Sequence, residues 1–307
     1  MEMRFFLTKN GYSILESPWG QVRGFFMEIL VVDRESLTNQ LISSKLGAKG
    51  HTVVAETNKN TAFDLIREGS FDCILIDPAP MAEARPVIIG IWKNIRTPVK
   101  PYIMLLSKTA TSEEAVLSGT NDVLNKPLST QDLEQKIGNA ERLLSIGRKL
   151  ASGENDVHSS GGMIGKNAFN QLFLSATDRA FRYGERSLIV FIHMTNQAEL
   201  QARLAPEIYD VVIEKLTAQM TFMRRQSDVI ARISPQDFAI LLQRPQYDTE
   251  PVDAINRFSE TLNKFCQAFE DPTMAPRLHL TLIDLPQGAQ HAERFVPAQK
   301  TAAADQA

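Results

Sequence analysis

The sequence predicts an α/β domain with a doubly wound parallel sheet, followed by an α+β domain built around an antiparallel hairpin. The chain has 307 residues, 43% of them hydrophobic, which exceeds the usual size of one core and can supply two. In the first half, uninterrupted apolar runs alternate with helical patterns, as in a parallel sheet covered on both faces. In the second half, two short apolar runs flank a polar turn among longer helical segments.

The elements of the first half follow a regular alternation. Strands are predicted at 28–32, 51–55, 71–77, 101–106 and 122–124, and helices at 36–47 and 61–68. Residues 29–32 and 73–76 are apolar without interruption, which indicates strands buried on both faces. The order predicts a flavodoxin-like fold whose site lies at the carboxyl ends of the strands.

Residues 27–150 resemble the receiver domain of two-component response regulators. Asp77 ends the third strand and matches the phosphoacceptor, Ser107 matches the hydroxyl residue of the site, and Lys126 matches its lysine. The resemblance implies a phosphoryl site served by magnesium and a histidine kinase. Two departures put that role in doubt.

The first departure is Asp33-Arg34, which replaces the usual acidic pair, and the second is Val123, which replaces the aromatic switch residue. We expect Arg34 to lie near the magnesium position, to pair with Asp77 and to lower metal affinity. This favours a pseudo-receiver used for dimerisation or docking. Phosphorylation of Asp77 stays open as the alternative.

The regions outside the two domains are predicted from composition and spacing. A helix is predicted at 131–149. Its apolar residues are spaced four, three and four, at Leu133, Ile137, Ala140 and Leu144, and form a narrow stripe suited to packing or to a short coiled coil. Residues 151–162 are rich in Ser and Gly and predict a linker. Residues 1–26 form an N-terminal extension, and residues 287–307, rich in Ala and Gln, predict a disordered tail.

In the second domain, 163–286, runs at 229–233 and 238–242 flank a Ser-Pro-Gln-Asp turn. Helices are predicted at 168–183, 206–225 and 251–269, and further strands at 188–193 and 277–283, which gives a palm-like α+β sheet. The hairpin resembles that of the GGDEF family, the diguanylate cyclases, whose Gly-Gly-Asp-Glu-Phe turn holds GTP phosphates and two metal ions.

Against that family the turn is degenerate. Ser234 and Pro235 replace the glycines, Gln236 replaces a metal-binding carboxylate, and Asp237 and Phe238 match. Proline has no N–H to offer a phosphate, and an amide is a poor ligand for a hard cation.

Other family positions lie upstream of the turn. His193 and Thr195 stand where the family has metal carboxylates, Gln201 and Ala202 replace guanine-contacting residues, and Asp210 matches. The sequence therefore predicts no catalytic residues, no bound metal and no cyclase activity.

A second nucleotide site of the family is retained in sequence. Arg225-Gln226-Ser227-Asp228 matches the Arg-x-x-Asp motif at the family's offset from the turn, and Arg257 matches a further arginine if one residue is inserted. The resemblance implies that Arg225, Asp228 and Arg257 bind cyclic di-GMP. The alternative is an ordinary surface ion pair at a helix end.

Composition limits the classes of partner. The net charge of −3 and pI near 6.0 give no general attraction to nucleic acid or membranes. Cys73 and Cys266 are expected to be free thiols, and no apolar run has the length of a membrane span. We expect a cytoplasmic homodimer that requires no cofactor, binds cyclic di-GMP and contacts an unidentified protein partner. Two alternatives are a weak cyclase regulated through Asp77 and a scaffold that binds no nucleotide.

Overall fold

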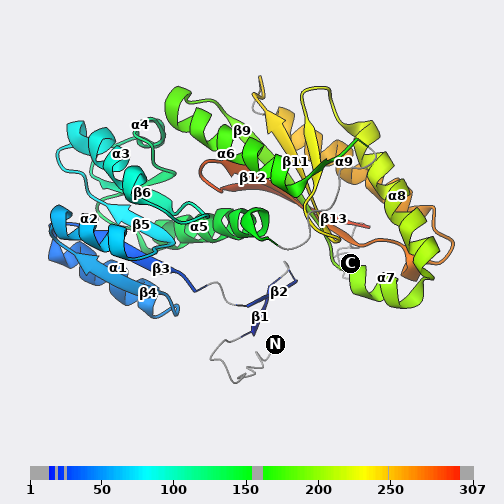
Figure 1. Ribbon diagram of the computed structural model, residues 1–307, viewed down its shortest axis with the longest axis horizontal. Helices are drawn as coiled ribbons and strands as arrows, with labels where there is room; N and C mark the ends of the chain where they lie inside the picture. The colour runs from blue at the N-terminus through cyan, green and yellow to red at the C-terminus, as the bar shows by residue number, and fades with distance from the viewer. Residues whose placement is uncertain (1–13, 18–19, 24–25, 154–161, 248, 298–307) are drawn as a thin grey trace, which may run out of the picture. The chain divides into compact units, whose positions relative to one another are not determined.

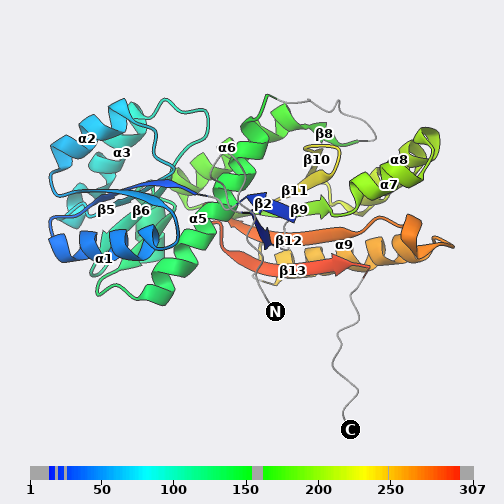
Figure 2. The same cartoon turned by 90° about the horizontal axis from the view of Figure 1, so that it is seen from below.

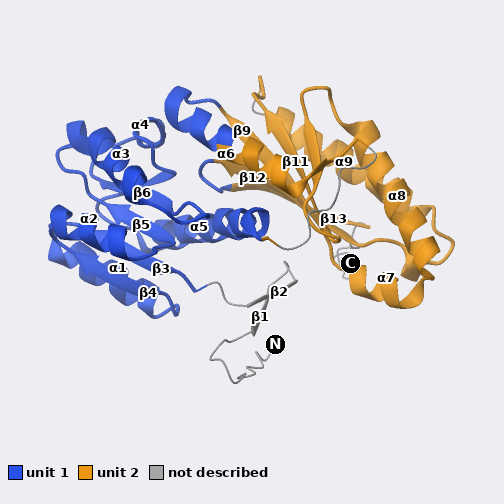
Figure 3. Ribbon diagram, viewed as in Figure 1, with its two compact units in different colours: residues 1–152, 175–185, 286–289 blue, residues 153–174, 186–285, 290–307 orange. Residues whose placement is uncertain are grey.

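The computed structural model describes residues 14–17, 20–23, 26–153, 162–247 and 249–297. The chain divides into two compact units (Figure 3). Unit 1 comprises Met1–Ser152, Ser175–Glu185 and Pro286–Ala289, and unit 2 comprises Gly153–Leu174, Arg186–Leu285 and Gln290–Ala307.

Unit 1 is built on a five-stranded parallel sheet with the order β4-β3-β5-β6-β7 (Figure 1). The strands are β3 (Glu28–Val32), β4 (Thr52–Glu56), β5 (Cys73–Ile76), β6 (Tyr102–Ser107) and β7 (Asp122–Asn125). Counted within this sheet the order is 2-1-3-4-5, which is the flavodoxin-like order. The predicted doubly wound fold is confirmed, and the carboxyl ends of β3, β5 and β6 meet at one edge.

Among the described residues of unit 1, four helices and one 3-10 turn lie between these strands, and a fifth helix follows the last strand. They are α1 (Ser36–Gly47), α2 (Lys59–Glu68), η1 (Met81–Glu83), α3 (Ala84–Asn94), α4 (Ser112–Leu117) and α5 (Thr130–Ala151). In Figure 2, α2 and α3 lie over one face of the sheet, and α1 and α5 lie over the other. Ile66 and Ile88 pack against Leu30, Ile74 and Ile103 in a buried core on the first face.

Part of the N-terminal extension has regular structure. Strands β1 (Ile14–Ser17) and β2 (Gly20–Arg23) pair antiparallel, with Ile14 opposite Arg23 and Ser17 opposite Gly20. The remainder of residues 1–25 and most of the predicted linker, residues 154–161, lie outside the described residues.

Unit 2 contains a six-stranded sheet with the order β13-β12-β9-β11-β10-β8. The strands are β8 (Ile164–Gly165), β9 (Ser187–Met194), β10 (Val229–Arg232), β11 (Asp237–Gln243), β12 (Leu278–Leu285) and β13 (Gln290–Val296). The helices are α6 (Lys166–Tyr183), whose residues from Ser175 onward are assigned to unit 1, α7 (Gln197–Arg203), α8 (Pro206–Met223) and α9 (Glu250–Gln267), with a 3-10 turn η2 (Pro272–Met274). The predicted hairpin is β10 paired with β11, and the α+β prediction is confirmed.

The prediction of a disordered tail from residue 287 is wrong for β13. This strand pairs antiparallel with β12, from Leu278 opposite Val296 to Ile283 opposite Gln290. Ala292 and Val296 face the core, while most of the other residues are polar or charged, as in many edge strands. The strand escaped prediction because it contains so few apolar residues. Residues 298–307 lie outside the described residues.

The core of unit 2 lies on one face of its sheet. Val190, Ile192 and Phe238 pack there against Ile213 of α8 and Phe258 of α9. Because successive strand residues point to opposite faces, His193 and Asp237 lie on the other face. They are direct neighbours in the register of β9 and β11.

Both cysteines, Cys73 and Cys266, are free and buried, as predicted from their separation. Burial raises the pKa of the Cys266 thiol to about 12, so this thiol stays protonated at neutral pH. Among the helices that the structure describes, none is long and apolar enough to span a bilayer.

Candidate functional site

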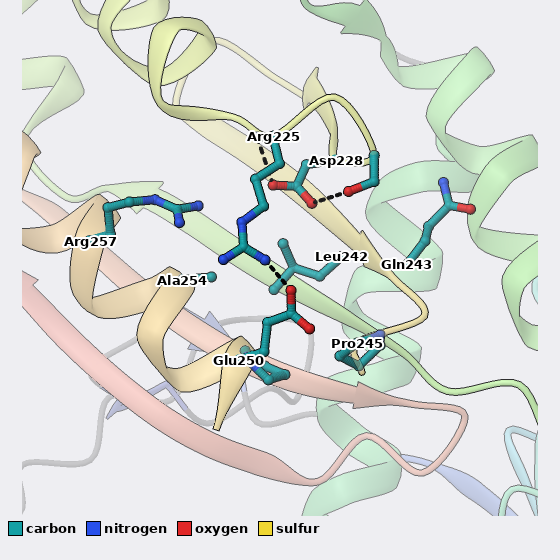
Figure 4. A pocket seen from close by; sticks show the side chains of 10 residues that line it. Arg225, Asp228, Leu242, Gln243, Pro245, Glu250, Ala254 and Arg257 are labelled. Carbon is teal, nitrogen blue, oxygen red and sulfur yellow. Dashed lines mark hydrogen bonds and ion pairs between the residues drawn. The ribbon is translucent and has the colours of Figure 1, made fainter. Parts of the chain in front are cut away.

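A pocket in unit 2 is formed by the loop after α8, the end of β11 and the first half of α9 (Figure 4). The space it outlines is about 300 Å³, which includes open solvent. Its lining residues are Arg225, Ser227, Asp228, Leu242, Gln243, Pro245, Glu250, Pro251, Ala254 and Arg257. The structure thus brings Arg225, Asp228 and Arg257, predicted from separate segments, into one pocket.

Asp228 holds the loop after α8 in a tight turn. Its Oδ2 accepts the backbone N–H of Arg225 at 3.0 Å, and the backbone N–H of Asp228 donates to the carbonyl oxygen of Arg225 at 3.0 Å. The residue is 6% exposed, while Oδ1 lies 3.5 Å from the hydroxyl of Ser227. One carboxylate oxygen therefore shapes the turn, and the other is weakly engaged.

Arg225 crosses the pocket toward the N-terminus of α9. Its guanidinium donates to Oε1 of Glu250, and the two side chains are 48% and 26% exposed (Figure 4). Glu250 also accepts the backbone N–H of Gln246 at 2.8 Å. This backbone hydrogen bond, followed by the charge of Arg225, lowers the pKa of Glu250, which is therefore ionised at neutral pH.

Glu250 is a pocket residue that the sequence analysis missed. It lies seven residues before Arg257, with Ala254 between them, so the spacing of four and three places all three on one face of α9. That spacing is the signal in the sequence from which Glu250 could have been predicted.

Arg257 enters the pocket from α9 (Figure 4). Its Nε and Nη2 are buried and have no hydrogen-bond partner among the described residues. Its Cζ lies 5.7 Å from the ring centroid of Phe258, so the guanidinium contacts an aromatic surface. Buried donors without acceptors are unfavourable, and each such group typically costs about 1–3 kcal/mol. Arg257 thus brings unsatisfied donors to the wall of the pocket.

The turn at 234–237 is stabilised by hydrogen bonds of its own side chains. The Ser234 hydroxyl accepts the backbone N–H groups of Gln236 and Asp237, at 3.2 and 3.0 Å, and donates to Asp237 Oδ2 at 2.9 Å. Asp237 Oδ1 lies 2.8 Å from Nδ1 of His193. Both oxygens of this buried carboxylate are thus engaged within the protein.

Metal ions of the cyclase kind require several converging carboxylates. Across the described ranges, no three His, Cys, Asp or Glu side chains form a group that could hold a metal ion. Beside the turn, His193 bonds to Asp237, while Thr195 donates to the backbone oxygen of Arg277 at 3.2 Å. The residues present do not fit a two-metal site.

In unit 1, Lys126 bridges two carboxylates at the edge of the parallel sheet. Its Nζ lies 2.6 Å from Asp33 Oδ2 and 2.6 Å from Asp77 Oδ2. The Lys126 and Asp33 side chains are 5% and 1% exposed. Burial opposes the charged ammonium, yet the hydrogen bonds to Asp33 and Asp77 outweigh it and raise the pKa of Lys126.

The expected ion pair between Arg34 and Asp77 is not found among the described residues, where Arg34 is exposed. Lys126, which follows β7, reaches Asp77, which follows β5, because both strands end at the same edge of the sheet. Ser107, the matched hydroxyl residue, accepts the backbone N–H groups of Thr109 and Ala110 at 3.2 and 3.1 Å. Lys126 thus occupies one oxygen of each of the two carboxylates.

Comparison with known proteins gives partial likenesses. No family model matches the chain. The transcriptional regulatory protein SrrA of Staphylococcus aureus is 27% identical over 113 residues, which are 36% of this chain and 46% of that protein. This chain therefore spans just under half the length of that relative.

Two solved structures align with parts of the chain. The receiver domain of the Francisella response regulator 1452 aligns at 26% identity and a TM-score of 0.33, covering 38% of this chain and 97% of that chain. The GGDEF domain of DgcB from Caulobacter crescentus, solved in complex with cyclic di-GMP, aligns at 12% identity and a TM-score of 0.36. It covers 44% of this chain and 83% of that chain.

Sheet order and site residues define the class of the protein. The flavodoxin-like sheet with Asp33, Asp77, Ser107 and Lys126 at its edge makes the first part a receiver-like domain. The mainly antiparallel sheet with its β10–β11 hairpin makes the second part similar in fold to a GGDEF domain. The chain is thus a receiver-like domain followed by a GGDEF-like domain.

Proposed function

We propose that this protein is a catalytically inactive signalling protein that binds cyclic di-GMP in the Arg225–Asp228–Arg257 pocket. The observation that carries the proposal is the pair of buried Arg257 nitrogens that have no partner among the described residues, in a pocket shared with Arg225 and Asp228. Binding would satisfy those donors and signal through a protein partner. We further propose a cytoplasmic homodimer, with a histidine kinase as a possible partner of unit 1.

The chemistry of the ligand suits the pocket. Cyclic di-GMP carries phosphodiester anions, and its guanines present O6 and N7 as acceptors and N1–H and N2–H as donors. A guanidinium forms two parallel hydrogen bonds to a phosphate or to O6 and N7, which is the role of Arg225 and Arg257. Asp228 Oδ1, which Ser227 engages weakly, is the acceptor for a guanine N–H.

The first test is calorimetric titration of the intact protein with cyclic di-GMP beside Arg225→Ala. We expect micromolar or tighter binding, weakened about 10- to 100-fold in the variant, because a charge-assisted hydrogen bond contributes roughly 1.5–3 kcal/mol. Lys215→Ala, which removes an exposed positive charge from α8, is the matched control and should bind like the unchanged protein. If the intact protein gives no heat and a second method agrees, the scaffold alternative is favoured.

Asp228→Asn extends this titration to the carboxylate. The amide keeps an oxygen that can accept the Arg225 N–H and so preserves the turn, but it loses the charge offered to guanine. We expect weaker binding with an unchanged unfolding midpoint. Equal affinity would restrict Asp228 to shaping the loop.

Incubation with GTP and either Mg²⁺ or Mn²⁺ is expected to yield no cyclic di-GMP above the background of a protein-free sample. Asp237 is the carboxylate that the turn retains, and His193 and Ser234 engage both of its oxygens. An active cyclase run in parallel shows that the assay detects product. Product that appears with this protein and disappears in Asp77→Ala would support the regulated weak cyclase instead.

A further inference from the structure

Glu250 places an anion on Arg225 in the ligand-free protein. The contact is an ion pair between Oε1 and the guanidinium, and the second oxygen, Oε2, is fixed by the backbone N–H of Gln246 at 2.8 Å. The carboxylate is therefore held in place from the protein side. It presents to Arg225 the kind of oxygen anion that a phosphodiester presents.

The two arginines of the pocket differ in whether the protein itself supplies an anion to the guanidinium. Arg225 has an internal anion, whereas Nε and Nη2 of Arg257 have no hydrogen-bond partner among the described residues. The lowered pKa of Glu250 means that it keeps its charge at neutral pH. An anionic ligand that contacts both arginines therefore competes with this carboxylate for Arg225 and meets its repulsion.

We propose that Glu250 is a built-in competitor that occupies Arg225 until an anionic ligand displaces it, and so sets the affinity of the pocket. This inference rests on the proposed binding of cyclic di-GMP at the same site. Displacement breaks the contact between the loop after α8 and the start of α9. When the ligand binds, contacts through the ligand therefore replace the direct ion pair between these two segments.

Glu250→Gln separates charge from shape. The amide oxygen still accepts the Gln246 N–H, while the ion pair with Arg225 and the repulsion of the ligand are lost. We expect cyclic di-GMP to bind about two- to fivefold more tightly, because a partly exposed ion pair contributes up to roughly 1 kcal/mol. Glu270→Gln, which removes an exposed charge beyond the end of α9, should leave affinity unchanged.

The tighter binding expected for Glu250→Gln must depend on Arg225. We expect Arg225→Ala and the double variant Arg225→Ala/Glu250→Gln to bind equally weakly, because without the arginine there is nothing for Glu250 to occupy. A gain of the same size in both backgrounds would indicate general charge repulsion and overturn the competitor role. Weaker binding in Glu250→Gln would instead make Glu250 a ligand contact.

The failure of this inference is distinguishable from failure of the proposed function. If the intact protein binds and Arg225→Ala does not, but Glu250→Gln binds with unchanged affinity, the receptor stands and the competitor role is wrong. If neither the intact protein nor Glu250→Gln binds cyclic di-GMP, both proposals fall together.

Discussion

Replacing Arg257 with methionine should weaken cyclic di-GMP binding by about 10- to 100-fold while leaving the free energy of unfolding unchanged or raising it. Two guanidinium nitrogens of Arg257 are buried without partners among the described residues, so their removal relieves an unfavourable burial. Methionine retains an unbranched apolar chain against Phe258. The same removal deletes the charge-assisted hydrogen bonds to the ligand.

The measurement pairs calorimetric titration with urea unfolding of the ligand-free protein. Lys264→Met removes a positive charge from the last turn of the same helix, outside the pocket lining, and should alter neither quantity by much. Loss of binding accompanied by a large loss of stability would give Arg257 a structural role. Unchanged binding would place Arg257 outside the ligand site.

Replacing Lys126 with methionine should lower the free energy of unfolding by about 3–5 kcal/mol. The substitution leaves the carboxylate of Asp33, which is 1% exposed, without the cation that lies 2.6 Å away, and breaking one side of a buried ion pair has an effect of that size. Lys108→Met is the control, because its side chain is 70% exposed and pairs with the half-exposed Glu35. We expect the control to change stability by less than about 1 kcal/mol.

The pH dependence of the free energy of unfolding tests whether the charge of Lys126 causes the stabilisation. The pKa of Lys126 is raised in the folded protein, so its stabilisation is complete below the ordinary lysine value of 10.5 and falls as pH rises above it. The difference between the parent and Lys126→Met should therefore be constant from about pH 7 to 9. Adding Asp33→Asn to Lys126→Met should recover part of the loss; no recovery would show that packing, and not charge, explains it.

Hydrophobic pattern predicted most of both sheets, because buried strands need uninterrupted or alternating apolar residues. It missed α3, where Pro86 precedes a continuous apolar run that has no helical period. Proline is tolerated there because the first turn of a helix has no internal acceptor for its N–H groups. The pattern also missed α4, which has six residues, and β13, whose outward side chains are polar.

Motif spacing was sufficient to predict which arginines and which aspartate share the candidate pocket. Arg225, Asp228 and Arg257 were expected together and line one pocket. The partner of each charge was not predictable, since it depends on side-chain direction across elements far apart in sequence. Thus Lys126, not Arg34, pairs with Asp77, and Glu250 pairs with Arg225.

The contact between His193 and Asp237 also bears on how such a protein evolves. Replacing His193 alone with aspartate would bring two buried carboxylates together, at a spot where 2.8 Å now separates a ring nitrogen from an oxygen. Replacing Asp237 alone would leave the buried imidazole without its acceptor. Each change is therefore unfavourable without the other, so the residues at positions 193 and 237 are expected to change together.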